Sequence, residues 1–363
     1  MSNQLRRLHI NQVRNLDSVR LEDLQRVNVF FGANGSGKTS VLEAIHLLGM
    51  ARSFRGSIRS LVTHGHQACT VFGGLTPGNQ SIGVQRGLTG DVQIKVNGSS
   101  VRTVAELVAI LPLQVITAES FDLLTGAPGA RRRFLDWGVF HVEQGFYGQW
   151  QRYQRGIKQR NILLRHGKMS GQELAVWTRE IAQSGEALSA DREAYFTRLA
   201  PRFRDIMEGL APSLKDLELR YRKGWDKQLS LLEALENSLS ADREQGYTHV
   251  GPQRADMRVF VDGRLAAEVL SRGQQKLVVC GLKLAQGMVM AEAERGNCAY
   301  LVDDLPAELD REHAGLVCSL LSSMSAQVFI TCVQREDISA VWPAEGGAEL
   351  AMFHVEQGNA TRQ

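Results

Sequence analysis

The residues from Gly32 to Thr39 have the types and spacing of a loop that binds a polyphosphate. Its glycines let the backbone turn sharply and point successive N–H groups inward, and the helix-like run that follows adds partial positive charge at its N-terminus. Lys38 would bridge the β- and γ-phosphates, and the Thr39 hydroxyl would bind Mg²⁺. The sequence therefore predicts a site for a nucleoside triphosphate. Its predicted residues are Gly32, Ala33, Asn34, Gly35, Ser36, Gly37, Lys38, Thr39 and Ser40.

Two acidic residues follow an apolar, strand-like run much later in the chain. Tyr300 to Val302 is apolar, and Asp303 and Asp304 come directly after it. A buried strand that delivers a carboxylate to the edge of a sheet places a Mg²⁺ ligand beside the phosphates. We expect Asp303 to bind Mg²⁺ with Thr39, and Asp304 to orient or deprotonate the attacking water. The alternative is a strand that simply ends at a polar turn.

The segment Leu270 to Gln274, Leu-Ser-Arg-Gly-Gln, stands before a helix-like run and forms a second potential anion site. Its serine can cap the helix, and its glycine permits a close approach of the backbone. Because the loop at Gly32 to Thr39 already wraps one nucleotide, the economical hypothesis is that this segment closes over the nucleotide of a second subunit. The predicted signature segment, acting in trans, is Ser271, Arg272, Gly273 and Gln274. The predicted catalytic residues are Asp304, Lys38 and Ser271.

Positive charge and aromatic side chains are concentrated between Arg131 and Lys168. This stretch contains nine Lys or Arg residues against two acidic ones. Several of the basic residues recur at helical spacing and would form one face along a phosphate backbone. An ordinary solvated helix face with its aromatic residues in the core fits the same pattern. The candidate DNA contacts are Arg131, Arg132, Arg133, Arg152, Arg155, Lys158 and Arg160.

Length and composition exclude several classes of protein. The chain has 363 residues, enough for two or three domains or for one domain with a large insertion. Its five cysteines lie far apart without a Cys-x-x-Cys pair, which argues against a disulfide framework or a zinc site and favours a reducing cytoplasm. No run approaches about 18 apolar residues and no signal-like segment is present, so we expect neither export nor a membrane span. The net charge of +3 does not by itself indicate a partner.

The spacing of apolar residues divides the chain into three parts. Residues 1–118 contain short strand-like runs and the helix after the loop, residues 119–245 have helical spacing, and residues 246–363 return to strand-like runs around a helix. We predict an α/β nucleotide-binding lobe that is assembled from both ends of the chain and interrupted by a helical lobe. The hexapeptide Phe-His-Val-Glu-Gln-Gly occurs at 140–145 and at 353–358 without further self-similarity, so it does not indicate a repeat fold.

The loop, the Leu-Ser-Arg-Gly-Gln segment and Leu-Val-Asp-Asp, in this order, resemble the ABC-type ATPase heads, in which two heads sandwich two ATP molecules. Within that group, nearly the whole chain is similar to the RecF family of bacterial recombination-repair ATPases. The most specific part of the likeness is the Gly-x-Pro-x-x-Arg-Arg-x-Phe-Leu-Asp pattern at 126–136. The further matching segments are 43–48, 53–55, 123–125, 159–161 and 307–310.

The resemblance implies an ABC-type head of mixed sheet and helices with an inserted helical lobe and no long coiled coil. It implies a homodimer dependent on ATP and Mg²⁺ that binds DNA at gaps, helps to load RecA with RecO and RecR, and hydrolyses ATP weakly with stimulation by DNA. Such a protein would be cytoplasmic and associated with the nucleoid. Gly32 to Thr39 carry over as the ATP loop, Asp303 as the Mg²⁺ ligand and Asp304 as the catalytic base. Ser271 to Gly273 carry over as the segment that completes the partner's site.

Other classes of protein share part of this pattern. A transporter-coupling ATPase would place a histidine after the strand-like run Val328 to Thr331, where Cys332 and Val333 stand. An SMC-like chromosome-maintenance ATPase would need hundreds of heptad residues between its two halves, far more than this insertion provides. A small-molecule kinase would share the phosphate loop alone and would leave Leu270 to Gln274 unexplained.

Overall fold

The computed structural model describes residues 3–166, 171–214, 216–294, 296–343 and 350–363. The chain forms two compact units. The first unit comprises Met1–Phe121, Gly209–Ala211 and Arg272–Gln363, and the second comprises Asp122–Glu208 and Pro212–Ser271. Lys168, the end of the predicted basic stretch, lies outside the described residues.

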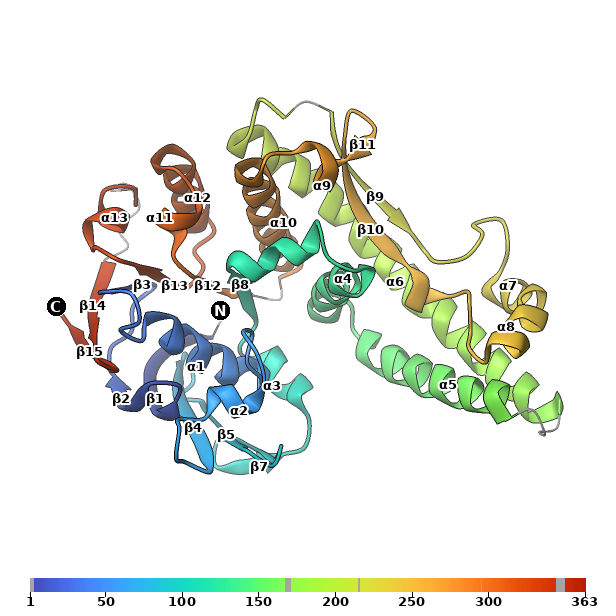
Figure 1. Ribbon diagram of the computed structural model, residues 1–363, viewed down its shortest axis with the longest axis horizontal. Coiled ribbons are helices and arrows are strands. Elements are labelled where there is room, and N and C mark those ends of the chain that lie inside the picture. The colour runs from blue at the N-terminus through green and yellow to red at the C-terminus, as the bar shows by residue number, and fades with distance from the viewer. Residues whose placement is uncertain (1–2, 167–170, 215, 295, 344–349) are drawn as a thin grey trace. The chain divides into compact units, whose positions relative to one another are not determined.

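Two six-stranded sheets build the first unit (Figure 1). The antiparallel sheet has the strand order β2-β1-β4-β5-β6-β7, with β1 Gln4–Val13, β2 Leu16–Leu21, β4 Ala68–Thr76, β5 Ser81–Gly87, β6 Val92–Val96 and β7 Ser99–Val101. The other sheet has the order β15-β14-β3-β13-β12-β8 and is parallel except for its edge strand β15. Its strands are β3 Val27–Phe31, β8 Leu113–Ile116, β12 Ala299–Val302, β13 Val328–Cys332, β14 Leu350–Glu356 and β15 Asn359–Arg362.

The parallel strands carry the apolar runs expected of strands that are covered on both faces. Four of the five residues of β3 are buried, and β12 and β13 are buried along their whole length. The helix α1 (Lys38–Met50) contacts strands of both sheets and is buried on nearly all its sides. The main hydrophobic core of the first unit therefore surrounds the helix that begins inside the predicted nucleotide loop.

None of the other helices in the described part of the first unit is longer than α1, with one exception. The exception is α10 (Arg272–Glu292). A buried hydrogen bond of 2.6 Å from Gln114 Nε2 to Gln286 Oε1 connects β8 to this helix. The remaining helices are α2 Ile58–Leu61, α3 Val104–Ile110, α11 Leu305–Glu308, α12 Arg311–Ser323 and α13 Glu336–Ser339. A 3-10 helix, Ala118–Leu123, crosses the division between the units.

The second unit combines helices with a small antiparallel sheet of order β11-β10-β9. Its helices are α4 Pro128–Val142, α5 Phe146–His166, α6 Gly171–Leu210, α7 Leu231–Asn237, α8 Leu239–Gln245, the 3-10 helix Pro252–Arg254 and α9 Ala266–Val269. Its strands are β9 Leu217–Arg222, β10 Asp256–Val261 and β11 Arg264–Leu265. Three arginine–aspartate pairs at 2.7 Å connect these elements: Arg131–Asp256, Arg160–Asp242 and Arg192–Asp136. Removing one partner of such a buried pair costs about 3–5 kcal/mol.

The α/β fold with an inserted, largely helical part agrees with the prediction from sequence. The second boundary differs from the predicted one, because the second unit continues to Ser271 and does not end at residue 245. The reason is that β10 pairs with β9 along its whole length. That partner, β9, is itself a strand inside the segment predicted to be helical.

The five cysteines are buried and are not joined by disulfide bonds. Burial raises the pKa of Cys69 to about 11 and that of Cys280, Cys298, Cys318 and Cys332 to about 12, so these thiols stay protonated near neutral pH. Among the described residues, no helix combines the length and the apolar character needed to cross a membrane.

Candidate nucleotide site

The predicted nucleotide loop lies between the C-terminal end of β3 and the start of α1. Gly32, Gly35 and Gly37 have φ of 150°, 80° and 118°, a region that glycine adopts without steric cost. Gly37 is the N-cap of α1, so the N-terminus of the helix opens into the loop. The backbone therefore has the geometry of an anion site at a helix N-terminus.

Two polar groups of the loop, the Lys38 ammonium and the Ser36 hydroxyl oxygen, are buried. Lys38 is 7% exposed, and its Nζ donates hydrogen bonds to the carbonyl oxygens of Gly32 at 2.8 Å and Ala33 at 2.9 Å. The Oγ of Ser36 is buried and has no hydrogen-bond partner among the described residues. Phosphate oxygens would accept stronger, charge-assisted hydrogen bonds from the lysine than the carbonyls do. An anion is therefore the ligand that these two groups favour.

The two residues predicted to bind Mg²⁺ contact each other directly. Thr39 Oγ1 donates to Asp303 Oδ1 at 2.9 Å. Thr331 Oγ1, fully buried in β13, donates to the same carboxylate oxygen at 2.8 Å and accepts the backbone N–H of Asp304 at 2.8 Å. One threonine therefore positions both predicted acids, and sequence reasoning missed it because nothing in the local pattern marks a buried threonine as a partner of distant acids.

Asp304 is the N-cap of α11 and has a left-handed backbone, with φ of 51°. Burial raises the pKa of its carboxyl, and the charge of Asp303 raises it further. A carboxylate with a raised pKa is a better proton acceptor than an ordinary aspartate. This environment fits the predicted role of Asp304 as the base that activates water.

An ion pair links the turn that carries Asp304 to α10. The backbone N–H of Glu308 donates to Asp304 O at 3.2 Å, and the Glu308 carboxylate pairs with Lys276 Nζ at 2.7 Å. Lys276 lies near the start of α10, two residues after the end of the predicted signature segment. Ser271, Arg272 and Gly273 are exposed at the start of this helix, which is the position that a segment acting on a second subunit requires.

The buried carboxylate of Glu43 connects two of the segments that carry the resemblance, both of which lie at or near α1. Glu43 is fully buried and accepts two hydrogen bonds from Arg14, from Nε at 2.7 Å and from Nη2 at 2.8 Å. The hydroxyl of Ser53 also donates to Glu43. The segments 43–48 and 53–55, which carry part of the resemblance, are thus held together by one carboxylate.

The structure separates the seven candidate DNA contacts into three groups by exposure. Arg131 is 6% exposed and pairs with Asp256, and Arg160 is 0% exposed and pairs with Asp242. Neither guanidinium can reach a phosphate backbone, so the assignment of these two residues to DNA contacts is corrected. Arg132 is half-buried and donates to the carbonyl oxygen of Ala255 at 2.9 Å. The exposed candidates are Arg133, Arg152, Arg155 and Lys158.

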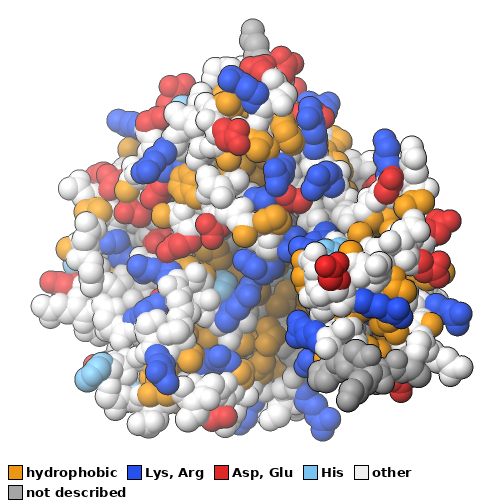
Figure 2. All heavy atoms as spheres, turned by 45° about the vertical axis from the view of Figure 1, so that its right-hand side comes forward, with side chains coloured by type: hydrophobic (Ala, Val, Ile, Leu, Met, Phe, Trp, Pro, Cys, Tyr) orange, Lys and Arg blue, Asp and Glu red, His pale blue; other side chains and the backbone are white. Residues whose placement is uncertain are grey.

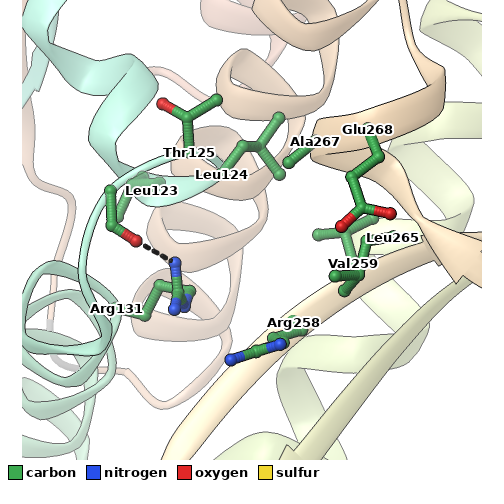
Figure 3. Close-up of a pocket in the computed structure, with 10 residues that line it drawn as sticks. Leu123, Leu124, Thr125, Arg131, Arg258, Val259, Leu265, Ala267 and Glu268 are labelled. Atoms are coloured by element: carbon green, nitrogen blue, oxygen red, sulfur yellow. Dashed lines mark hydrogen bonds between the residues drawn. The ribbon is translucent and has the colours of Figure 1, made fainter.

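Arg131 lines a cavity of about 380 Å³ in the second unit, together with apolar side chains and two further charged ones, Arg258 and Glu268 (Figure 3). Its Nη1 donates to the carbonyl oxygen of Gly126 at 2.7 Å, and its Nε contacts Asp256, which also accepts from Arg258 at 2.7 Å. The Gly-x-Pro-x-x-Arg-Arg pattern therefore has a structural role, because its first arginine joins α4 to β10.

Comparison with known proteins finds similar sequences over almost the whole chain. The RecF/RecN/SMC N-terminal domain model matches residues 4–359. The DNA replication and repair protein RecF of Stutzerimonas stutzeri (strain A1501) is 49% identical over 362 residues, which cover 99% of this chain and 97% of the relative. RecF of Pseudomonas aeruginosa (strain LESB58) is 48% identical with the same coverage of both chains.

Solved structures are similar over almost the whole chain. The recombination mediator protein RecF-ATPrS in the RecFOR pathway matches with a TM-score of 0.84 and 25% identity, covering 99% of this chain and 98% of that one. The Smc head domain of Pyrococcus furiosus, bound to the C-terminal domain of ScpA, matches with a TM-score of 0.59 and 14% identity, covering 99% and 96%. The second likeness concerns the fold alone.

The position of Thr331 leads to a prediction for catalysis. Thr331→Val keeps the approximate shape of the side chain but removes the hydroxyl that donates to Asp303 and accepts from the Asp304 backbone. We expect kcat for ATP hydrolysis to fall roughly 10- to 100-fold, with ATP binding nearly unchanged, as measured by phosphate release and by equilibrium binding of ATP. Thr331→Ser keeps the hydroxyl and should stay near the wild-type rate. An equal loss in both variants would contradict the role of the hydroxyl.

Proposed function

Because this chain is a member of the RecF family of DNA replication and repair ATPases, we propose that it acts on DNA as a dimer that ATP closes. Its class is that of the ATP-binding, ATP-hydrolysing ABC-type ATPases. The observation that carries the proposal is that one unit holds the nucleotide loop and the two acids together, while Ser271 to Gly273 are exposed. In a sandwich of two chains, each exposed segment covers the nucleotide of the other.

We propose that Thr39 and Asp303 would hold a Mg²⁺ ion, which would compensate the charge of the phosphates. Mg²⁺ keeps several waters and is usually held by one or two carboxylates together with substrate phosphates. The contact of 2.9 Å between Thr39 Oγ1 and Asp303 Oδ1 supports this, because both oxygens already lie beside the loop. The described residues contain no cluster of three or more His, Cys, Asp or Glu side chains that would form an all-protein metal cage.

In the proposed cycle, the residues from Gly32 to Ser40 receive the phosphates, Lys38 compensates the γ-phosphate charge, and Asp304 accepts a proton from water. Ser271 of the partner, followed by Arg272, Gly273 and Gln274, closes the site. ATP binds the dimer more tightly than the monomer, and this difference in affinity drives closure. Hydrolysis is weak and stimulated by DNA, and it opens the dimer again. The aspartate at 304 is one methylene shorter than a glutamate, which is compatible with slow turnover.

The DNA surface in this proposal includes Arg133, Arg152, Arg155 and Lys158, with Arg132 at its edge. Arg152 also pairs with Glu180 at 3.0 Å, so part of its charge is compensated within the unit. Figure 2 shows Lys and Arg side chains interspersed with Asp and Glu on the face drawn, as expected for a net charge of only +3. The dimer would act at single-strand gaps in the nucleoid and would help to load RecA with RecO and RecR.

Lys38→Met tests the loop. Removing the ammonium that balances the phosphate charge should abolish ATP binding and, with it, dimerisation on addition of ATP and Mg²⁺. Analytical ultracentrifugation with and without the nucleotide measures the mass directly. Lys227→Met, an exposed lysine of the second unit, serves as the control and should dimerise normally. A Lys38→Met protein that still dimerises with ATP would rule out the assignment of the loop.

Ser271→Arg tests closure in trans. The long charged side chain should block approach of the partner's nucleotide, so that the single chain still binds ATP but no longer dimerises. Equilibrium binding of ATP and sedimentation separate the two effects. Ser100→Arg introduces the same side chain at another exposed position and should leave dimerisation intact. Dimerisation of the Ser271→Arg protein would contradict the role of this segment.

Reversing charge on the proposed DNA face should change the dependence of binding on salt. The double variant Arg155→Glu/Lys158→Glu should bind DNA more weakly, and the slope of log K against log salt should fall by about two, because two phosphate contacts are lost. The control Arg204→Glu/Lys227→Glu makes the same change in charge at exposed positions of the same unit. An unchanged slope in the first variant would mean that this face is an ordinary solvated one.

A further inference from the structure

The hairpin of β14 and β15 packs beside β3 in the first unit (Figure 1). Its two turn residues, Gln357 and Gly358, have φ of 47° and 77°, the backbone of a tight two-residue hairpin turn with a left-handed conformation at both positions. Glu356 pairs with Asn359 across this turn. The second copy of Phe-His-Val-Glu-Gln-Gly therefore forms the last strand residues and the turn of this hairpin.

The hairpin contacts the nucleotide loop at two backbone positions. The N–H of Gly358 donates to the carbonyl oxygen of Ser36 at 3.0 Å. At Gly32, an added Cβ would lie 2.2 Å from the carbonyl oxygen of Val355, so the two backbones touch there. Both contacts are made by main-chain atoms, and side-chain rotation cannot relieve them.

Asn15, in the turn between β1 and β2, contacts both the nucleotide loop and the hairpin. Asn15 Nδ2 donates to the carbonyl oxygen of Gly35 at 3.3 Å, and Asn15 Oδ1 accepts from Ser40 Oγ at 2.7 Å. The backbone of Asn15 also meets the hairpin, because a Cβ on Gly358 would lie 2.2 Å from Asn15 O. The loop, Asn15 and Gly358 are thus in mutual contact, and only a glycine fits at 358.

The bond from Gly358 has a direct consequence for the loop. The peptide unit between Ser36 and Gly37 is planar and trans, so its C=O and its N–H point in opposite directions. When the Ser36 carbonyl is held toward Gly358, the N–H of Gly37 points away from the hairpin. In a phosphate loop, successive N–H groups must point to the anion.

We propose that the turn of this hairpin is part of the ATP site, where Gly358 is a positioning residue that sets the orientation of the Ser36–Gly37 peptide for the phosphates. The inference deepens the proposed function and rests on it only in taking Gly32 to Thr39 as the ATP loop. It assigns a role to a segment that carries none of the nucleotide motifs.

The chain supplies a matched control for Gly358. The turn between β6 and β7 has the same backbone, with φ of 50° at Asn97 and 79° at Gly98, but nothing lies within 4 Å of a Cβ at Gly98. Gly358→Ala and Gly98→Ala therefore introduce the same left-handed alanine, and only the first one collides with Asn15. We expect Gly358→Ala to weaken ATP binding at least about tenfold, which corresponds to about 1.4 kcal/mol, and Gly98→Ala to leave it unchanged.

Equilibrium binding of a fluorescent ATP analogue to both variants, to wild type and to Lys38→Met measures the effect. Equal affinities of Gly358→Ala and Gly98→Ala would overturn the role of the hairpin, while a Lys38→Met protein that still binds ATP would overturn the loop assignment instead. A second test, hydrogen exchange of the wild-type protein, does not depend on the folding of any variant. ATP with Mg²⁺ should slow exchange at 357–359 and not at 97–99, and equal exchange at 357–359 with and without ATP would also overturn the proposal.

Discussion

One carboxylate oxygen, Oδ1 of Asp303, fixes the relative positions of three elements that lie far apart in the sequence. It accepts hydroxyl hydrogen bonds from Thr39 in the first turn of α1 and from Thr331 in β13, while Asp303 itself follows β12. The arrangement depends on the strand order β3-β13-β12, which places β13 between the nucleotide loop and the acids. Because parallel strands end at the same edge of a sheet, a crossover of this kind converts distant residues into neighbours. The chemistry of the site is therefore a property of the sheet topology.

Sequence alone predicts the parts of this site whose signal is local. The loop, the apolar run before it and the strand that ends in Asp303 are each recognisable within a few residues, and β3 and β12 lie where those runs indicate. The partners of these segments are not recognisable in this way. Thr331 is an ordinary residue of an apolar strand, and the pairing of β14 with β3 is a contact between opposite ends of the chain. Such contacts depend on the topology, which no local pattern records.

The arginines of the second unit show that a local sequence pattern also does not predict the partners of charged side chains. Helical spacing shows which side chains share a face of a helix, but it does not show what that face contacts in the folded protein. Arg131 and Arg160 form ion pairs with aspartates that lie far away in the sequence. Because these pairs are buried, removing one partner strongly lowers the stability of the fold. Part of the positive charge that a local count would assign to a binding partner thus forms ion pairs inside the protein. The candidates that stay exposed are Arg133 on α4 and Arg152, Arg155 and Lys158 on α5.

The same hexapeptide has two different structures in this protein. At 140–145 it finishes α4 and leaves the helix, whereas at 353–358 it is the end of β14 and the following turn. The two copies share a glycine with a left-handed backbone, with φ of 90° at Gly145 and 77° at Gly358. A left-handed glycine after the glutamine is thus common to both copies, although their secondary structures differ. The surrounding residues determine whether the segment ends a helix or a strand. We therefore expect that the segment, grafted into another protein, would bring a chain reversal at its glycine and no fixed secondary structure.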